Sequence, residues 1–166
     1  NMNRIQNEIR HGKFISQKGE EIWNWSSPAG KIRWERRTGL FISAIGSNCN
    51  ILEVGCGTGL FTKEIQHTNN KITAIDISPH LIEIAKKRIS NPSVDLIVGN
   101  AYDTPFNDNS FDCIIGSSAL HHLDVGLAIK EFHRLLKPGG KILFTEPNML
   151  NPQIAVQKNI PAFKSW

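Results

Sequence analysis

The chain has 166 residues, of which 40% are hydrophobic and 20% are charged, and its formal net charge is +4. This length lies within the range of one domain and is sufficient to bury a sizeable core. No apolar run approaches the roughly 18 residues of a membrane-spanning helix, and the polar N-terminus lacks the apolar core of a signal peptide. Cys49, Cys56 and Cys113 are odd in number and show no C-x-x-C spacing, so we expect neither a disulfide framework nor a metal site. These features predict a cytoplasmic domain with reduced cysteines.

The positive charge is concentrated in the N-terminal third. Residues 1–50 contain eight Lys or Arg and four Glu, whereas the charges of the remainder balance. Such a surplus favours an anionic substrate, a membrane surface or nucleic acid as partner, and a solvated helix face explains it as well. Because no repeat interleaves basic with aromatic residues, nucleic acid is the least favoured of these partners.

The first clear helix is expected to begin at Ser27-Pro28, because proline suits the first turn. Its apolar residues are expected to face inward: Ile32, Leu40, Phe41 and Ile45. Aromatic residues gather in and before it: Phe14, Trp23, Trp25 and Trp34. Such residues could pack against the sheet.

A short apolar run from Ile51 to Val54 then predicts a buried strand that ends in a glycine turn. Gly55, Gly57 and Gly59 permit a tight bend and a close approach of a ligand to the backbone, because glycine lacks a Cβ and tolerates positive φ. The spacing is Gly-x-Gly-x-Gly, and Leu60 occupies the position of the third glycine of dinucleotide-binding loops. The turn therefore predicts a nucleoside-binding site that differs from the usual dinucleotide site.

A second apolar run, 71–76, ends in Asp76, about 20 residues beyond the glycine turn. A carboxylate at this distance can accept hydrogen bonds from ribose hydroxyls. The same residue could simply end a strand, and a carboxylate at this position also suits NAD.

Strand and helix patterns alternate through the rest of the chain, which indicates parallel β-α-β units. Further strands are expected over 94–98, 111–116 and 141–145. One helix is expected over about 58–67. A second is expected to begin at Ser78-Pro79, which supply an N-cap and a first-turn proline, and to end at about 89. A third is expected to begin at Asp124 and to end before Pro138-Gly139-Gly140. This order predicts an α/β fold with a doubly wound parallel sheet of five strands.

Five segments together resemble one family. The glycine turn with Glu53 before it resembles motif I of the class I S-adenosylmethionine-dependent methyltransferases of small molecules. Beyond Asp76, segments 99–106, 111–123 and 135–143 resemble the family's loop after the third strand, its fourth-strand block and its turn before the fifth strand. The resemblance implies a Rossmann-like core over 49–147 that binds S-adenosyl-L-methionine. Residues 1–48 are expected to form a helical segment that covers the substrate, loosely as in quinone-biosynthesis-like methyltransferases, and 148–166 an irregular tail.

The resemblance also implies which residues meet the cofactor: Glu53, Gly55, Cys56, Gly57, Gly59, Asp76, Ile77, Asn100, Ala101 and Ser117. In the family the glycine loop faces the methionine portion, and the glutamate organises this loop or meets the ammonium group. Asp76 would hold the ribose, while Asn100, where many relatives carry Asp, would read the adenine edge with Ala101. Ile77 would pack against adenine or belong to the core, and Ser117 would lie beside the methionine portion.

Methyl transfer from a sulfonium is an in-line displacement, so holding the nucleophile in place is the main task of the protein. An acidic hydroxyl nucleophile would also gain from a general base. The candidates are His122, which we favour, His121 and Asp124, because the loop after the fourth strand borders the crevice where ligands bind in such sheets. Many relatives instead use this histidine to line the cofactor pocket, and Asp124 is more simply a helix N-cap.

The end of the chain departs from the family, whose members add two further strands after the fifth. Only 146–166 follow here, with prolines at positions 152 and 161, so we expect a truncated chain that lacks the sixth and seventh strands. The strand 141–145 would then have an open apolar edge, covered by a second chain in a homodimer or by the tail 147–166. Neither cover would complete the acceptor site, so we expect cofactor binding without efficient turnover.

The sequence thus predicts a cytoplasmic S-adenosylmethionine-dependent methyltransferase that modifies an O, N or C nucleophile of a small-molecule acceptor. One alternative is a nicotinamide-dependent dehydrogenase, which Leu60 disfavours. Another is a cofactor-binding protein that does not catalyse efficiently.

Overall fold

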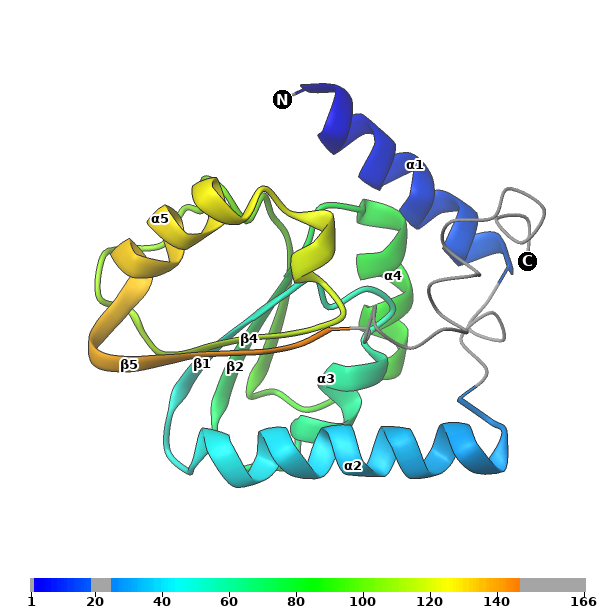
Figure 1. Cartoon of the computed structure of the whole chain (residues 1–166), viewed down its shortest axis with the longest axis horizontal. Coiled ribbons are helices and arrows are strands. Elements are labelled where there is room, and N and C mark those ends of the chain that lie inside the picture. The colour runs from blue at the N-terminus through cyan, green and yellow to red at the C-terminus, as the bar shows by residue number, and fades with distance from the viewer. Residues whose placement is uncertain (1, 19–24, 147–166) are drawn as a thin grey trace.

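The structure is a computed structural model that describes residues 2–18 and 25–146. Strands and helices alternate through most of it (Figure 1). In chain order the elements are α1 (Met2–Lys18), α2 (Pro28–Ile45), β1 (Asn50–Val54), α3 (Leu60–Ile65), β2 (Lys71–Asp76), α4 (Pro79–Arg88), β3 (Val94–Val98), β4 (Phe111–Ser117), the short 3-10 helix η2 (Leu120–His122), α5 (Val125–Leu135) and β5 (Leu136–Thr145). Within the described ranges no helix combines the length and the apolar character needed to cross a membrane.

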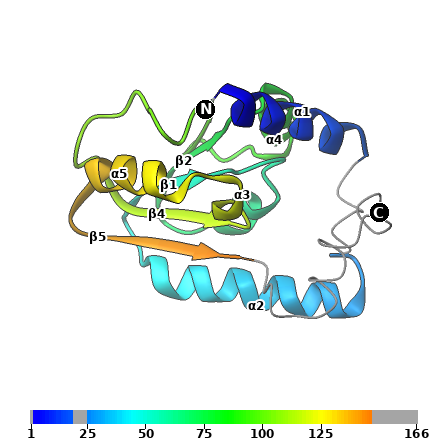
Figure 2. The same cartoon turned by 45° about the horizontal axis from the view of Figure 1, so that its top comes forward.

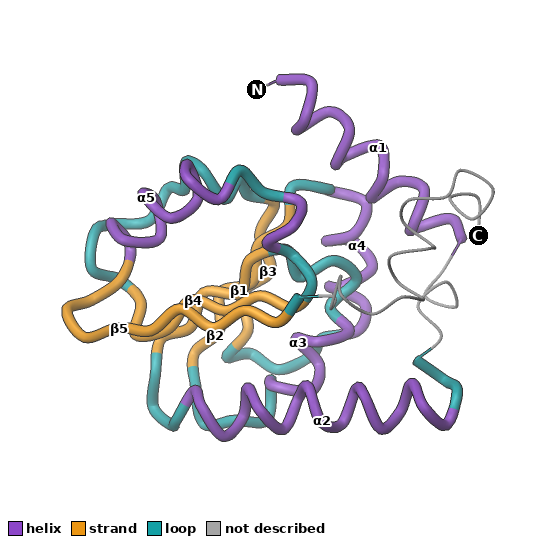
Figure 3. The backbone as a smooth tube through the Cα atoms, in the orientation of Figure 1, coloured by secondary structure: helices purple, strands orange, loops and turns teal. Residues whose placement is uncertain are grey.

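The five strands form one parallel sheet in the order β3-β2-β1-β4-β5 (Figure 3). From the central strand β1 the chain winds outward through β2 and β3, and then through β4 and β5 on the other side. The predicted doubly wound α/β sheet is therefore confirmed. Because the winding direction changes between β1 and β4, a crevice is expected at the carboxyl ends of these strands, where Val54 and Ser117 lie.

Helices cover both faces of the sheet, so the central strands are buried on both sides. Successive residues of a strand point to opposite faces, and both Ile51 and Leu52 are fully buried. One face packs against α2, α3 and α4, and the other packs against α5 through Ala128, Phe132 and Leu135. Figures 1 and 2 show α2 and α5 on opposite sides of the sheet.

Helix α2 begins as predicted, because the Ser27 hydroxyl accepts a hydrogen bond from the Gly30 N–H at 3.0 Å. Phe41 and Ile45 are buried, as expected. The prediction for Ile32 and Leu40 was wrong, since their side chains are 66% and 61% exposed. Neither residue is three, four or seven positions from Phe41 or Ile45, so both lie off the buried stripe of the helix.

The junction between α5 and β5 also differs from the prediction. The helix ends at Leu135, and Pro138-Gly139-Gly140 lies inside β5 instead of stopping the helix. Leu136 is already extended, and Lys137 precedes a proline, which disfavours helical backbone. The strand is irregular here, because Gly139 has a φ of 80° and the pairing register shifts between Phe111 and Cys113. Helix α3 is likewise shorter than expected, because 58–59 remain in the glycine turn.

Helix α1 packs closely against α4. A Cβ added at Gly12 would lie 2.5 Å from Ser78 Cβ, so a larger residue would push the helices apart. Ser78 occupies the N-cap position of α4, but its side chain makes no capping hydrogen bond, contrary to expectation. This contact places α1 next to the carboxyl end of β2, beside the crevice.

Strand β5 forms one edge of the sheet and pairs with β4 alone, as expected for the last described strand. The Ile142 side chain is 39% exposed there. Residues 147–166 lie outside the described residues. It therefore stays a prediction that this segment or a second chain covers the edge. The division of the chain into three segments also stays a prediction.

Candidate functional site

A cavity of about 1170 Å³ opens at the carboxyl ends of β1, β2 and β4, where the strand order reverses. Its walls come from the glycine turn, the strand ends, η2, and the helices α1 and α2. The structure brings most of the predicted site residues to this cavity: Glu53, Gly55, Cys56, Gly57, Asp76, Ile77, Asn100, Ala101, Ser117, His121 and His122. Gly59 and Asp124 are the exceptions.

The glycine turn adopts the backbone conformation that its sequence suggests. Gly55, Gly57 and Gly59 have φ values of 72°, 56° and 75°, which side chains disfavour. A Cβ at Gly55 would also lie 2.7 Å from Ala119 Cβ. Gly59 is needed for packing, because a Cβ there would lie 3.0 Å from Ala85 Cβ on α4. The turn therefore presents backbone to the cavity at Gly55 and Gly57, and holds α3 against α4 at Gly59.

Glu53 lies in β1 beneath the turn and is 1% exposed. Burial raises the pKa of Glu53 to about 7, although the neighbouring Thr62 hydroxyl opposes this shift. Its Oε2 atom has no hydrogen-bond partner among the residues that the structure describes. An unpartnered carboxyl oxygen at a cavity wall is a ready acceptor for a cationic donor, since ionisation is then favoured.

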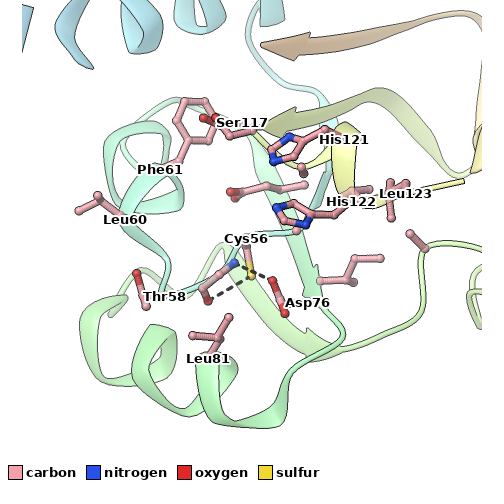
Figure 4. Close-up of a pocket in the computed structure, with 18 of the residues that line it drawn as sticks. Cys56, Thr58, Leu60, Phe61, Asp76, Leu81, Ser117, His121, His122 and Leu123 are labelled. Atoms are coloured by element: carbon pink, nitrogen blue, oxygen red, sulfur yellow. Dashed lines mark hydrogen bonds between the residues drawn. The ribbon is translucent and has the colours of Figure 1, made fainter. Parts of the chain in front are cut away.

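Asp76 ends β2 and braces the glycine turn. Its Oδ2 accepts a hydrogen bond from the Gly57 N–H at 2.9 Å, and its Oδ1 accepts one from the Ser78 N–H at 2.9 Å. Burial raises the pKa of Asp76, while these two backbone donors oppose the shift. Figure 4 shows Asp76 close to Cys56. A carboxylate has about four lone-pair sites, so capacity remains for ligand hydroxyls.

Ile77, which follows β2, and the loop after β3 also line the cavity. Ala101 is buried, and Ile77 and Asn100 are half-buried. Asn100 Oδ1 accepts a hydrogen bond from the Tyr102 N–H at 3.1 Å, which fixes the orientation of the amide. This wall combines apolar surface with amide donors, as recognition of a heterocycle requires.

His121 and His122 face the cavity from η2, with ring centroids 4.0 Å apart (Figure 4). Each has a carboxylate partner: His121 Nδ1 lies 2.5 Å from Glu146 Oε2, and His122 Nδ1 lies 3.1 Å from Glu8 Oε2 of α1. Burial and His121 lower the pKa of His122, whereas Glu8 opposes this shift. Asp124 caps α5, because its Oδ1 accepts from the Leu127 N–H at 3.2 Å.

The sequence did not identify Arg37 or Glu8 as site residues. Arg37 Nη1 donates to Ser117 Oγ at 3.0 Å and to Ser118 Oγ at 2.8 Å, and its guanidinium lies 5.2 Å from the centre of the Trp25 ring. Desolvation lowers the pKa of Arg37, and Glu146 opposes the shift. The basic charge and tryptophans of the N-terminal segment were the available signals, but they do not specify a contact between residues 80 positions apart.

Comparison with known proteins is consistent with this geometry. The model of the methyltransferase domain family matches residues 52–144, from β1 to β5. A demethylmenaquinone methyltransferase of Staphylococcus aureus (strain MRSA252) is 32% identical over 169 residues, a match that includes 98% of this chain. The chain spans 66% of the length of that relative.

Solved structures share the fold. Phosphoethanolamine N-methyltransferase 1 of Haemonchus contortus, in complex with phosphoethanolamine and S-adenosylhomocysteine, has a TM-score of 0.71 at 18% identity, over 86% of this chain and 32% of that one. The [4+2]-cyclase SpnF has a TM-score of 0.62 at 31% identity, over 68% of this chain and 44% of that one. The match of the family model covers more than half of the chain. The chain therefore belongs to the methyltransferase domain family.

Proposed function

We propose that this chain binds S-adenosyl-L-methionine and transfers its methyl group to an O, N or C nucleophile of a small organic acceptor. Membership of the methyltransferase domain family supports this assignment. The Staphylococcus relative is named for methylation of a small molecule, and the Haemonchus enzyme of the same fold holds S-adenosylhomocysteine. The family match favours methyl transfer over nicotinamide-dependent hydride transfer and over binding without catalysis.

The residues around the cavity suit this cofactor. The buried Oε2 of Glu53 lacks a partner in the described part of the chain, and an α-ammonium group would supply one, directly or through water. The glycine turn leaves room for backbone contact with the methionine portion, because Gly55 and Gly57 present no side chain. Asp76 would accept ribose hydroxyls in addition to its two backbone donors. The cofactor supplies an activated methyl group on a sulfonium.

The other end of the cofactor's amino-acid portion would meet Arg37. This guanidinium is fixed by the hydroxyls of Ser117 and Ser118 at the carboxyl end of β4, beside the place expected for the methionine portion. Arginine pairs well with a carboxylate because its donors match both oxygens. Ile77, Asn100 and Ala101 would enclose the adenine at the far wall.

His122 is the proposed general base for the acceptor. It faces the same cavity, and the contact of Glu8 with Nδ1 would orient the ring and favour the tautomer with a proton on that nitrogen. An acceptor with an acidic hydroxyl would lose its proton to the ring as the methyl group is transferred. The alternative role for His122 is to line the cofactor pocket without acting as a base.

The observation that carries the proposal is the convergence of the glycine turn, Asp76 and Ser117 on one cavity at the point where the strand order reverses. Titration calorimetry with S-adenosylhomocysteine and with NAD tests it. We expect saturable binding of S-adenosylhomocysteine and no measurable binding of NAD at the same concentrations. Preference for NAD, or absence of S-adenosylhomocysteine binding, would overturn the proposal.

A further inference from the structure

The cavity is larger than one ligand requires. Its volume of about 1170 Å³ exceeds the roughly 300–1,000 Å³ of an ordinary ligand pocket. Most residues assigned to the cofactor lie at the strand ends, whereas α1 and α2 add a further part of the wall. The part along α2 is therefore available for the acceptor.

This part of the wall is basic. Arg33, Arg36 and Arg37 all line the cavity from α2. In the portion of the chain that the structure describes, no carboxylate oxygen lies within ion-pair distance of any of the three. If Arg37 meets the carboxylate of the cofactor, Arg33 and Arg36, which are exposed, remain for a second anion.

The carboxylates that line the cavity are engaged elsewhere. Glu8 pairs with His122, and Glu146 pairs with His121. Asp76 accepts hydrogen bonds from two backbone N–H groups, and Glu53 is buried below the glycine turn. Among the described residues none of these carboxylates forms an ion pair with Arg33 or Arg36, so these arginines are available to the anionic group of a ligand.

The same part of the wall is also aromatic. The ring centroids of Trp25 and Trp34 are 5.1 Å apart, and those of Trp34 and Phe61 are 6.2 Å apart with the rings nearly perpendicular. The Arg33 guanidinium lies 6.0 Å from the centre of the Trp25 ring, so the charged and aromatic surfaces adjoin. Leu40 and Leu60 add apolar surface to the wall. A flat apolar body would pack here, with its anionic group directed to the arginines.

We propose that Arg33 and Arg36 form an oxyanion subsite for the acceptor, which is therefore an aromatic or other apolar molecule that carries a carboxylate or phosphate group. This inference rests on the proposed function and specifies the substrate class of the same cavity. Trp25 and Trp34 hold the body of the acceptor, and the two guanidinium groups hold its anion. Arginine suits both oxyanions, because its planar fork of donors matches their geometry.

Binding of small probes to protein saturated with S-adenosylhomocysteine tests the subsite. Phenyl phosphate and benzoate are the anionic probes, and phenol is the uncharged probe of the same ring size. We expect both anions to bind at least about tenfold more tightly than phenol, because charge-assisted hydrogen bonds to arginine are strong. The preference should fall to less than about threefold in the double variant Arg33→Gln/Arg36→Gln, with the affinity for S-adenosylhomocysteine unchanged.

Lys31→Gln is the matched control, since Lys31 lies on the same helix, is exposed and does not line the cavity. It removes one positive charge and should keep the full preference for the anions. Equal binding of phenol and the anions by the unmodified protein would overturn the inference, as would a preference that survives in the double variant. Either result with S-adenosylhomocysteine bound leaves the proposed function standing. Failure of S-adenosylhomocysteine to bind would overturn the proposed function and this inference with it.

Discussion

Asp76 accepts a hydrogen bond from the glycine turn, and it is also the residue that we propose to hold the ribose. We expect Asp76→Ala to weaken binding of S-adenosylhomocysteine by about 1.5–3 kcal/mol, or roughly 10- to 150-fold, through loss of charge-assisted bonds to the ribose. The substitution also leaves the Gly57 N–H without its acceptor, which would loosen the turn. Titration calorimetry measures the effect.

Asp95→Ala provides the matched control, because Asp95 is exposed on β3 and does not line the cavity. Its affinity should equal that of the unmodified protein. If Asp76→Ala binds equally well too, Asp76 is not part of the site.

Glu53 should make the stability of the protein without cofactor depend on pH. Its folded-state pKa of about 7 lies above the ordinary value of 4.5, so the folded protein retains a proton that the unfolded chain has lost between these values. The free energy of unfolding should therefore fall as pH rises from about 4.5 to 7, by up to about 3 kcal/mol. Glu53→Gln should flatten this dependence in urea unfolding at several pH values, and Glu64→Gln on the exposed side of α3 should not.

The same group should couple cofactor binding to pH. An ammonium group beside Glu53 favours the ionised carboxyl, so binding near pH 6 requires release of a proton. Affinity for S-adenosylhomocysteine should then increase between pH 6 and 8, and the increase should disappear in Glu53→Gln. A steady affinity in the unmodified protein would show that Glu53 only braces the turn.

His122 can be tested by following its ring protons with NMR as pH changes. Burial and His121 lower its pKa, so we expect a midpoint below the roughly 6.5 of an ordinary histidine. Glu8→Gln removes the carboxylate that opposes this shift, and the midpoint should move lower still.

As a base, His122 would make methyl transfer rise with pH through this midpoint. His122→Ala should then abolish transfer and leave affinity for S-adenosylhomocysteine close to normal, whereas a loss of that affinity would favour the pocket-lining role.

At the scale of the elements, two helical glycines provide a matched pair. A Cβ added at Gly12 on α1 would lie 2.5 Å from Ser78 Cβ at the start of α4. A Cβ added at Gly39 on α2 would have no atom within 4 Å. Alanine favours helix over glycine by about 0.8–1 kcal/mol, so Gly39→Ala should stabilise the protein by up to that amount. Gly12→Ala should gain less or destabilise, because α1 must move away from α4. Equal stabilisation of both variants in thermal unfolding would contradict the close packing of α1.

The elements differ in how far the sequence could predict them. Strands β1 to β4 were predicted nearly to their ends, because continuous apolar runs and glycine or proline breaks mark buried parallel strands. Ile32 and Leu40 were placed wrongly because one amphipathic helix offers more than one apolar stripe, and tertiary packing selects among them. The start of β5 was missed because Pro138-Gly139-Gly140 has the chemistry of a turn, yet the bulged pairing with β4 accommodates it.

The site residues also differ in how far the sequence could predict them. Residues on the glycine turn and at strand ends were predicted because a local motif and its spacing position them. Arg37 and Glu8 were missed because their contacts, with Ser117 and His122, join segments that are distant in sequence. Gly59 belongs to the same motif, but packing against Ala85 rather than the cavity explains it.

At the scale of the whole molecule, the prediction concerns the sheet edge at β5, which in the described part of the chain pairs with β4 alone. Unpaired backbone groups beside apolar side chains favour association with another chain. We expect a dimer that dissociates on dilution in light scattering, and slow amide exchange in β5 when it is dimeric. Ile142→Lys should shift the equilibrium to the monomer, because a charge at an exposed edge disfavours pairing. A monomer at all concentrations, with fast exchange in β5, would contradict the prediction that this edge is covered.

The central claim is that one cavity, at the reversal of the strand order, binds S-adenosyl-L-methionine. The most direct test is a titration of ¹⁵N-labelled protein with S-adenosylhomocysteine, followed through the backbone amide signals. The account predicts the largest shifts at Gly55, Gly57, Ile77 and Ala101, with the signals of β5 near Ile142 unchanged. Saturable binding with shifts confined to residues outside the cavity, or no shifts at any concentration, would contradict it.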